Sequence, residues 1–392
     1  MTEALVTPAV MEWARARHNL TIDELSRKVQ VKSSRLEEWE LGRSRPTFRQ
    51  AQKLAERLYI PFGYLFLSEP PKFEFSIPDF RTVSGERLRN PSPDFQDLLN
   101  DVIAKQEWYR EFLELEEAQP IPLIGKFSID NDPDDIARDI RTTLAINDRT
   151  RLAARSWEEF LRDVVRRVED VGILVMRSGI VGSNTHRPLS VEEFRGFVIA
   201  DEIAPLVFIN SKDAKSAQIF TLFHELVHLW IGEGGISNPI YREKSSGQIN
   251  GVERLCNRVA AEVLLPKVEF NSRWQDGVPL ELNLRQISSR FRVSKITVLR
   301  QALDQEKISG EIYWSYFQSE VDKYERTLAQ SEGGDFYNTF TARNSTVFTL
   351  ALIEATSEGR TTRREAARLL SVRVGTLDSV MDRFLGEGSQ DA

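Results

Sequence analysis

The chain has 392 residues, 41% of them apolar and 28% charged, and carries a formal net charge of −7. This composition excludes wholesale disorder, and the acidic balance excludes a uniformly basic nucleic-acid coat, so any DNA contact must come from a local basic patch. Cys256 is the only cysteine, which excludes an internal disulfide and suits a reducing compartment. No apolar run approaches the roughly 20 residues of a membrane helix, and no secretory signal pattern is present, so we expect a cytoplasmic protein without membrane contacts.

The N-terminal residues 1–70 are predicted to form a small helical bundle. Four short helical patterns lie between residues 11 and 67. Thr21 has Glu24 three residues later, which is the spacing of an N-terminal capping box. Gly42 fits the C-terminus of a helix. The segment RLEEWELGRSRPT within this layout resembles the Xre/Cro repressor-type helix-turn-helix domain.

This resemblance implies that the second helix of the motif enters the major groove of operator DNA. Residues 11–67 contain eleven Lys and Arg against seven Asp and Glu, a local charge of +4 that favours DNA. Glu37 and Glu38 lie on the presumed reading helix, so a bundle that makes only protein contacts is the alternative. The residues that match DNA-contacting positions are Lys32, Ser33, Ser34 and Arg35 on the helix, with Arg43 and Arg45 placed for backbone phosphates.

Residues 71–150 are predicted to be a connecting helical region. The proline-rich stretch at residues 68–82 places a domain boundary near residue 70. Residues 92–117 predict one long amphipathic helix capped by Ser92 or Asp94. That helix could serve as a spacer or join a homodimer, although packing onto its own chain is commoner. The aspartates of residues 129–144 fit the start of another helix better than a calcium loop.

Residues 151–270 carry the pattern of a metal site. A helix and three short strands are predicted to precede FTLFHELVHLW at residues 220–230. His224 and His228 are four residues apart, so both imidazoles project from one helix face and can reach one ion. Glu225 lies about 100° round the helix, where it can act on water as a base. The alternative is a core helix with satisfied histidines, but unpartnered buried polar groups cost several kcal/mol, as a rough estimate.

A tetrahedral zinc ion needs a third protein ligand. No histidine follows residue 228, so a carboxylate must serve. Glu233 follows the helix too closely to fold back. Glu253 begins a second helix pattern, and Asn257 one turn later could support the site. The four candidates are Glu233, Glu243, Glu253 and Glu262, and their spacing favours Glu253 only modestly.

Three segments, PLVFIN, FTLFHELVH and ERLCNRVAAEVLLP, resemble in this order the ImmA/IrrE family of metallopeptidases. The family's last motif reads Glu-x-x-Ala-Asn-x-Phe-Ala. Glu253, Asn257 and Ala260 match it, while Cys256 and Val259 replace the first alanine and the phenylalanine. The resemblance implies a zinc-dependent endopeptidase with Glu253 as the third ligand. Cys256 could also bind zinc, but its position suggests packing.

The resemblance also implies a zincin-like mechanism in which Glu225 takes a proton from water and passes it to the leaving amine. The LVFIN strand, residues 206–210, is expected to align an extended substrate through its main chain, as an edge strand can. Tyr241, Arg242 and Arg258 are candidates for stabilising the oxyanion.

Residues 271–392 are predicted to form a helical region with two further helix-turn-helix-like patterns, at 283–303 and 361–384. We expect these patterns to serve protein contacts and assign DNA binding to neither. The predicted fold class is therefore α+β and mostly helical: an N-terminal helix-turn-helix bundle, a central zincin-like small sheet with active-site helices, and a helical C-terminal region.

Two functions are consistent with this organisation. The first is a transcriptional regulator that binds operator DNA and uses zinc to cleave itself or a repressor-like partner protein. The alternative is the antitoxin of a toxin–antitoxin module, which would bind a toxin encoded nearby, repress the operon and keep the zincin fold as a scaffold.

Overall fold

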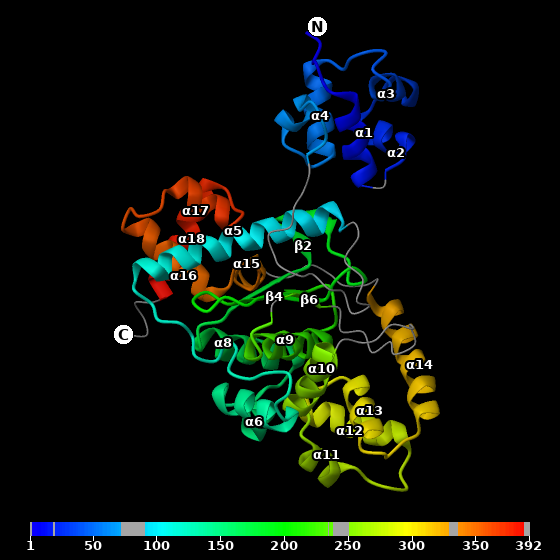
Figure 1. The fold of residues 1–392 in the computed structure, drawn as a ribbon, viewed down its shortest axis with the longest axis vertical. Coiled ribbons are helices and arrows are strands. Elements are labelled where there is room, and N and C mark those ends of the chain that lie inside the picture. Colours follow the sequence, from blue (N-terminus) through cyan, green and yellow to red (C-terminus); the bar gives the residue numbers. More distant parts are fainter. Residues whose placement is uncertain are drawn as a thin grey trace. The chain divides into compact units, whose positions relative to one another are not determined.

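The computed structural model of the protein describes residues 2–18, 20–71, 91–233, 235–237, 251–328 and 336–387. These ranges hold eighteen α-helices and six short strands, which confirms the predicted α+β, mostly helical fold. The chain divides into two compact units, one of residues 1–76 with 90–96 and one of the remaining residues (Figure 1).

The smaller unit is a helical bundle around one apolar core. Leu25, Leu36 and Trp39 are at most 1% exposed in that core. Thr21 and Glu24 form the predicted capping box at the start of the second helix. Gly42 has φ = 68° and ends the third helix, as glycine readily does. The elements are α1 (Pro8–Arg17), α2 (Ile22–Val29), α3 (Ser33–Glu40), α4 (Phe48–Arg57) and the 3-10 helix η1 (Phe62–Phe66).

A four-stranded mixed sheet lies at the centre of the larger unit, in the order β1-β5-β4-β6. β1 (Leu174–Ser178) and β5 (Leu206–Asn210) are parallel, whereas β4 (Gly196–Ile199) is antiparallel to both β5 and β6 (Gly235–Ser237). The LVFIN segment is β5 and pairs on both sides, so the expectation that it is a substrate-aligning edge strand is wrong. A separate pair is formed by β2 (Ile180–Val181) and β3 (Asn184–Pro188).

Helices cover both faces of the sheet (Figure 1). The face that carries Val175, Val198 and Val207 packs with α8 and α9 in the main apolar core. Ser92 caps the long helix α5, because its Oγ accepts from Phe95 N at 3.1 Å. The helices from residue 93 to residue 273 are α5 (Pro93–Leu115), α6 (Pro133–Thr143), α7 (Asp148–Ala153), α8 (Trp157–Asp170), α9 (Lys215–Trp230), α10 (Gly251–Leu264) and α11 (Lys267–Arg273).

The C-terminal helices are held to this body by a buried carboxylate. Glu169 at the end of α8 accepts from Ser345 Oγ at 2.5 Å and from Thr346 N at 3.2 Å, at the start of α16. Burial raises the pKa of Glu169 in spite of these bonds. Among the described helices, none is both long and apolar enough to cross a membrane. The helices are α12 (Leu280–Phe291), α13 (Lys295–Asp304), α14 (Gly310–Leu328), α15 (Phe336–Asn344), α16 (Thr346–Ser357), α17 (Arg363–Leu369) and α18 (Val374–Glu387).

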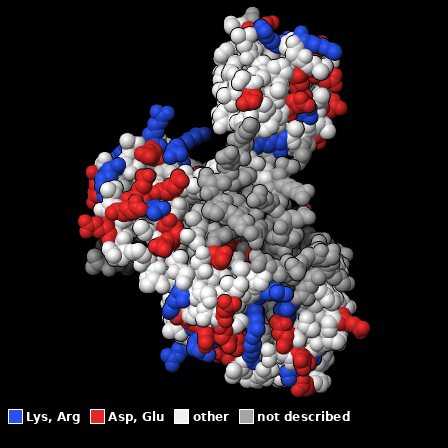
Figure 2. Space-filling view, in the orientation of Figure 1, with Lys and Arg blue, Asp and Glu red and all other residues white. Residues whose placement is uncertain are grey.

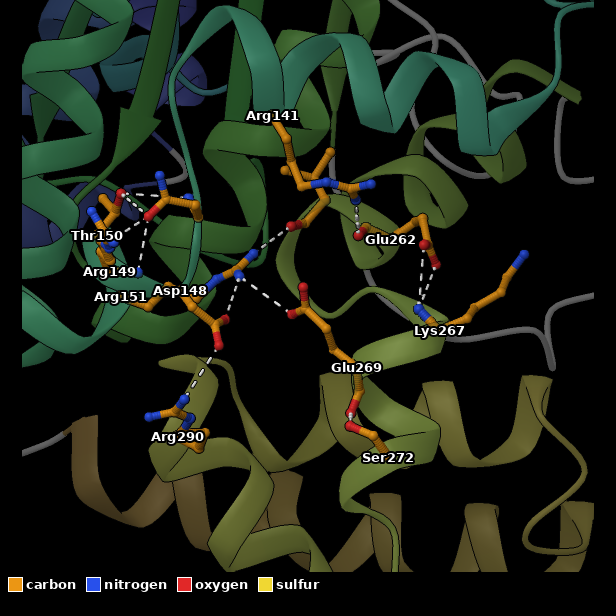
Figure 3. Close-up of polar contacts among 12 residues, drawn as sticks. Arg141, Asp148, Arg149, Thr150, Arg151, Glu262, Lys267, Glu269, Ser272 and Arg290 are labelled. Atoms are coloured by element: carbon orange, nitrogen blue, oxygen red, sulfur yellow. Dashed lines mark hydrogen bonds and ion pairs between the residues drawn. The ribbon is translucent and has the colours of Figure 1, made fainter.

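The C-terminal end of α10 is held by two arginines (Figure 3). Arg141 Nη1 donates to Glu262 O at 2.7 Å, and Arg151 Nη2 donates to Val263 O at 2.8 Å. Carbonyls in the last turn of a helix lack partners within the helix, and cations near that end also stabilise the helix dipole. The two arginines therefore fix the end of the helix on which Glu253 lies.

We expect Arg151→Met to destabilise the protein by about 2 kcal/mol, because it leaves a buried carbonyl without its donor. The Arg151 side chain is 2% exposed, and its ion-pair partners Asp148 and Glu269, each at 3.6 Å, are about half exposed. Urea unfolding followed by circular dichroism measures the change. Arg155→Met, at an exposed arginine of the following turn, is the control and should shift stability by less than about 0.5 kcal/mol. Equal midpoints for the two variants would contradict the assignment.

Candidate metal centre

The helix α9 is buried along almost its whole length. Every residue from Gln218 to Trp230 is buried, because apolar side chains flank the polar ones on both sides. The last carbonyls of α9 accept from a separate segment: Gly125 N donates to Leu229 O and Phe127 N donates to Trp230 O, both at 2.9 Å. The helix is therefore a rigid support for any site that it carries.

Three predicted ligands from two helices meet at one point. His224 Nε2 and His228 Nε2 on α9 are 3.3 Å apart. Glu253, in the first turn of α10, places Oε2 at 3.2 Å from His224 Nε2 and Oε1 at 3.4 Å from His228 Nε2. Asn257 Oδ1 lies 3.1 Å from His224 Nδ1. The structure thus brings together both histidines, the carboxylate and its neighbour on the next turn.

These separations fit a zinc ion. Ligand atoms at zinc bond lengths of 2.0–2.1 Å in tetrahedral geometry are about 3.3 Å apart, which matches the three distances between the nitrogen and oxygen atoms. Asn257 Oδ1 accepts from His224 Nδ1–H in the tautomer that leaves Nε2 with a free lone pair, the usual supporting contact of a metal-binding histidine. The donor set is therefore suited to zinc.

Cys256 offers a second ligand set. The ligand atoms of His224, His228 and Cys256 all lie within 4.8 Å of one another, so geometry alone allows a His-His-Cys site. Burial raises the pKa of the Cys256 thiol well above its usual value, which disfavours the thiolate that zinc requires. Glu253 instead places one carboxylate oxygen at 3.2 Å from His224 Nε2 and the other at 3.4 Å from His228 Nε2. Glu253, which reaches both Nε2 atoms, is the better third ligand.

Glu225 lies against the backbone of the sheet. Its side chain is fully buried, and a methyl group at Gly196 of β4 would lie 2.8 Å from Glu225 Oε1 and 2.7 Å from Thr221 Cγ2. Only a glycine leaves room there for the carboxylate. Sequence reasoning did not identify Gly196, although a glycine inside an apolar strand pattern is a signal of close approach.

We expect Gly196→Ala to lower any peptidase activity by about a hundredfold while zinc binding is kept, because the methyl group would push Glu225 out of place. The three atoms nearest to the added methyl group belong to Thr221, Glu225 and Phe208 and not to a histidine. Activity and bound zinc, measured on the same protein sample, test this expectation. Gly310→Ala, with open space around the glycine and no positive φ, is the matched control. Loss of zinc together with activity would contradict a local effect on Glu225.

The geometry of the site leads to a comparison with known proteins. Residues 168–303 match the family model of the IrrE N-terminal-like domain. Residues 11–65 match a helix-turn-helix model, and residues 344–383 match a domain of unknown function (DUF8813). The order of the first two matches confirms the resemblance seen in the sequence. The chain thus contains a helix-turn-helix domain followed by an IrrE N-terminal-like domain.

Other comparisons add little. No curated protein matches the chain. One solved structure, the apo form of ComR from S. thermophilus, matches with 14% identity over 98% of each chain, but the TM-score is 0.15. A score this low supports no statement about a shared fold.

The remaining candidates in the IrrE-like domain cap another helix, face solvent or lie outside the described residues. Glu262 accepts from Lys267 N at 3.2 and 3.3 Å and caps α11. Glu233 is exposed directly after α9, and Arg258 is exposed on α10. Tyr241, Arg242 and Glu243 lie outside the described residues.

In the helix-turn-helix domain, most of the predicted DNA contacts are exposed. Lys32, Ser34 and Arg35 lie at the start of α3 with their side chains in solvent, and Arg43 and Arg45 are exposed after it. Ser33 differs, because its Oγ donates to Asp23 Oδ1 at 2.5 Å. Ser33 therefore joins α3 to α2, and the basic residues are better placed for DNA.

Proposed function

We propose that the protein is a zinc-dependent endopeptidase and a DNA-binding transcriptional regulator, which cleaves itself or a repressor-like partner. The observation that carries this proposal is the meeting of two histidine Nε2 atoms and the Glu253 carboxylate, within 3.2–3.4 Å of one another, beside the buried Glu225. The helix-turn-helix domain in the same chain supports the regulatory part.

The presence of Glu225 favours an enzyme over the antitoxin alternative. A scaffold would need the metal ligands but no base, and burying a carboxylate is costly. Here the carboxylate is fully buried one residue after a ligand, in space that a glycine leaves open. This arrangement is typical of a catalytic group and serves no evident purpose in a scaffold.

The chain's own residues suit peptide hydrolysis. His224, His228 and Glu253 would hold a zinc ion, which supplies a Lewis acid that acidifies water and polarises a carbonyl. Glu225 would accept the proton of the attacking water and donate it to the leaving amine. Substrate would approach from the side of Glu253, since the Glu253 side chain is 12% exposed while that of His224 is fully buried.

Purified full-length protein provides a direct test of the peptidase. The protein is incubated with zinc or with a chelator, alone and with an extract of the cells that produce it, and new N-termini are identified by isotopic labelling and mass spectrometry. Zinc-dependent new termini in this chain or in a helix-turn-helix protein are expected. No zinc-dependent terminus in either experiment would refute the peptidase proposal and favour the antitoxin.

DNA binding by the N-terminal domain gives a separate prediction. We expect the double substitution Lys32→Ala and Arg35→Ala to weaken binding to operator DNA at least about tenfold and to lower the slope of log K against log salt by about 2. The DNA upstream of the protein's own gene is the probe, in fluorescence anisotropy over a range of salt concentrations. Glu12→Ala and Glu56→Ala are controls at other charged positions of the bundle. Unchanged affinity in the double variant would remove the assignment of α3 as the reading helix.

A further inference from the structure

Several helices of the described residues end in a residue of left-handed conformation, after which the next N–H donates to the carbonyl five residues earlier. In three of these turns, each between two helices, the residue that donates is a valine. The left-handed residues are Gln30, Arg292 and Ser371, with φ of 60°, 54° and 53°. The hydrogen bonds run from Val31 to Ser26 at 3.1 Å, from Val293 to Ser288 at 3.2 Å, and from Val372 to Ala367 at 2.9 Å. The first of these turns is that of the helix-turn-helix domain.

The third motif repeats the first in further detail. Ten residues before each valine stands a threonine, Thr21 or Thr362, whose side chain caps the first helix by accepting from the N–H of a glutamate. Five residues after each valine stands a buried leucine. Residues 362–380 align with residues 21–39 without a gap, and the identical pairs are Thr21 and Thr362, Glu24 and Glu365, Arg27 and Arg368, Val31 and Val372, and Leu36 and Leu377.

The middle motif uses its second helix for packing. Thr297, Val298 and Leu299 of α13 are buried, and no side chain in its first two turns is fully exposed. Three of its basic residues are also engaged: Arg290 pairs with Asp148, Lys295 with Glu281 and Arg300 with Asp304. This motif cannot present a helix to the major groove.

The third motif leaves its second helix open. Arg373, Gly375 and Ser379 at the start of α18 are exposed, while Leu377 and Val380 face the core. Residues 362–380 hold four arginines against two acids, a charge of +2, whereas residues 21–39 hold four basic and four acidic residues. Figure 2 shows basic side chains at the upper edge of the part formed by α16, α17 and α18, with acidic side chains below them.

Three of these arginines have no partner within the described part of the chain. Arg364, Arg368 and Arg373 are exposed, and no hydrogen bond or ion pair to their side chains is found there. Arg363 pairs with Asp378 at 2.8 Å across the two helices of the motif. Cations that are exposed and unpaired around an open second helix are the arrangement by which such a motif contacts phosphates.

Against the expectation that this pattern serves protein contacts, we propose that α17 and α18, in the domain of unknown function, form a second element that binds duplex DNA, with α18 entering the major groove. Arg373 stands at the position of Lys32 and faces the same groove edge, while Arg364 and Arg368 on α17 contact the backbone. The protein then carries one DNA-binding motif at each end, with the IrrE-like domain between them.

The experiment uses the full-length protein with Lys32→Ala and Arg35→Ala, so that the first motif no longer contributes. Its binding to a fluorescent random-sequence duplex of about 30 base pairs is measured by anisotropy at low and rising salt. Residual salt-dependent binding is expected. Adding Arg364→Ala and Arg373→Ala should weaken it about tenfold and lower the salt slope by about 2, one unit for each phosphate that is no longer neutralised.

The matched control adds Arg285→Ala and Arg155→Ala instead. Both residues are exposed and the charge change is the same, and Arg285 holds in the middle motif the place that Arg364 holds in the third. Any one of three results overturns the proposal: no residual binding in the starting variant, an equal decrease in the control, or unchanged DNA binding in the Arg364 and Arg373 variant. If this unchanged binding came with an altered sedimentation coefficient, the surface would be a protein interface. With a zinc chelator in the assay, none of these results depends on whether the IrrE-like domain cleaves peptides.

Discussion

Replacing Glu225 with glutamine is expected to abolish peptide cleavage while the protein still binds one zinc ion. Glutamine has nearly the same shape and fits beside Gly196, but it cannot accept a proton from water. Loss of a general base lowers the rate by about 10²–10⁴, and both proton transfers of the proposed mechanism use this carboxylate, so we expect the upper end of that range. The rate of appearance of the new N-terminus and the zinc content of the same sample are the two measurements.

Glu262→Gln is the matched control for this variant. Glu262 is also a buried glutamate, but it caps α11 and does not face the metal ligands. The Glu262→Gln variant should cleave at a rate close to that of the unmodified protein. If the Glu225 variant still cleaves at more than about a tenth of the normal rate, then Glu225 is not the base. If it loses zinc, the experiment reports on folding of the site and the Gly196 variant must decide.

Replacing Glu253 with alanine is expected to lower the affinity for zinc by more than about a hundredfold. The change leaves two histidines, and the other residue beside them is a cysteine whose raised pKa disfavours ligation. Zinc should therefore no longer raise the melting temperature of the variant, because a ligand stabilises the folded protein only when its concentration exceeds the dissociation constant. Competition with a chromophoric chelator gives the affinity, and thermal unfolding with and without zinc gives the stabilisation.

Two further variants separate the possible ligand sets. Cys256→Ala should bind zinc with unchanged affinity, whereas Asn257→Ala should bind it about 10–100-fold more weakly because His224 would lack its hydrogen-bond acceptor. If Cys256→Ala weakens zinc binding as much as Glu253→Ala does, the thiol is also a ligand and the assignment of Glu253 as the third ligand is wrong. These outcomes are distinct because Glu253 and Cys256 are three residues apart on the same helix and can be changed separately.

The parts of the fold that depend on local spacing could be predicted from the sequence. The capping box at Thr21 and the cap at Ser92 follow from side chains that bond to amides two or three residues away. The common face of His224 and His228 follows from the pitch of one helix. Each of these features depends on residues within about one turn of one another, so the sequence contains the whole interaction.

Features that depend on pairing between distant segments could not be predicted in this way. The interior place of β5 follows from β1 on one side and β4 on the other, and a strand pattern does not say how many neighbours it has. For the same reason the contact between Gly196 and Glu225 was not foreseen, since it depends on the register of β4 above α9. The position of Glu253 was favoured by spacing and by resemblance, and its distances to the histidines come from the packing of α10 on α9.

The third helix-turn-helix motif lies between these cases. Its turn and cap are local, and the alignment of residues 362–380 with residues 21–39 is visible in the sequence. The burial of α13 and the exposure of α18 are not local, because they depend on α14 and on the other helices packed nearby. The comparison that distinguishes the two motifs therefore required the structure.

The contacts that support α9 and α10 decide where a minimal IrrE-like domain can begin. Trp230 Nε1 donates to Asp139 at 2.9 Å, Gly125 N donates to Leu229 O, and Arg141 holds the end of α10. All three partners precede residue 151, in the region that the sequence predicts to be a connector. A fragment that begins at residue 151 would lack them and should be recovered as insoluble or zinc-free protein. A shortened protein that keeps these contacts, and is suited to crystallisation, must begin before Gly125.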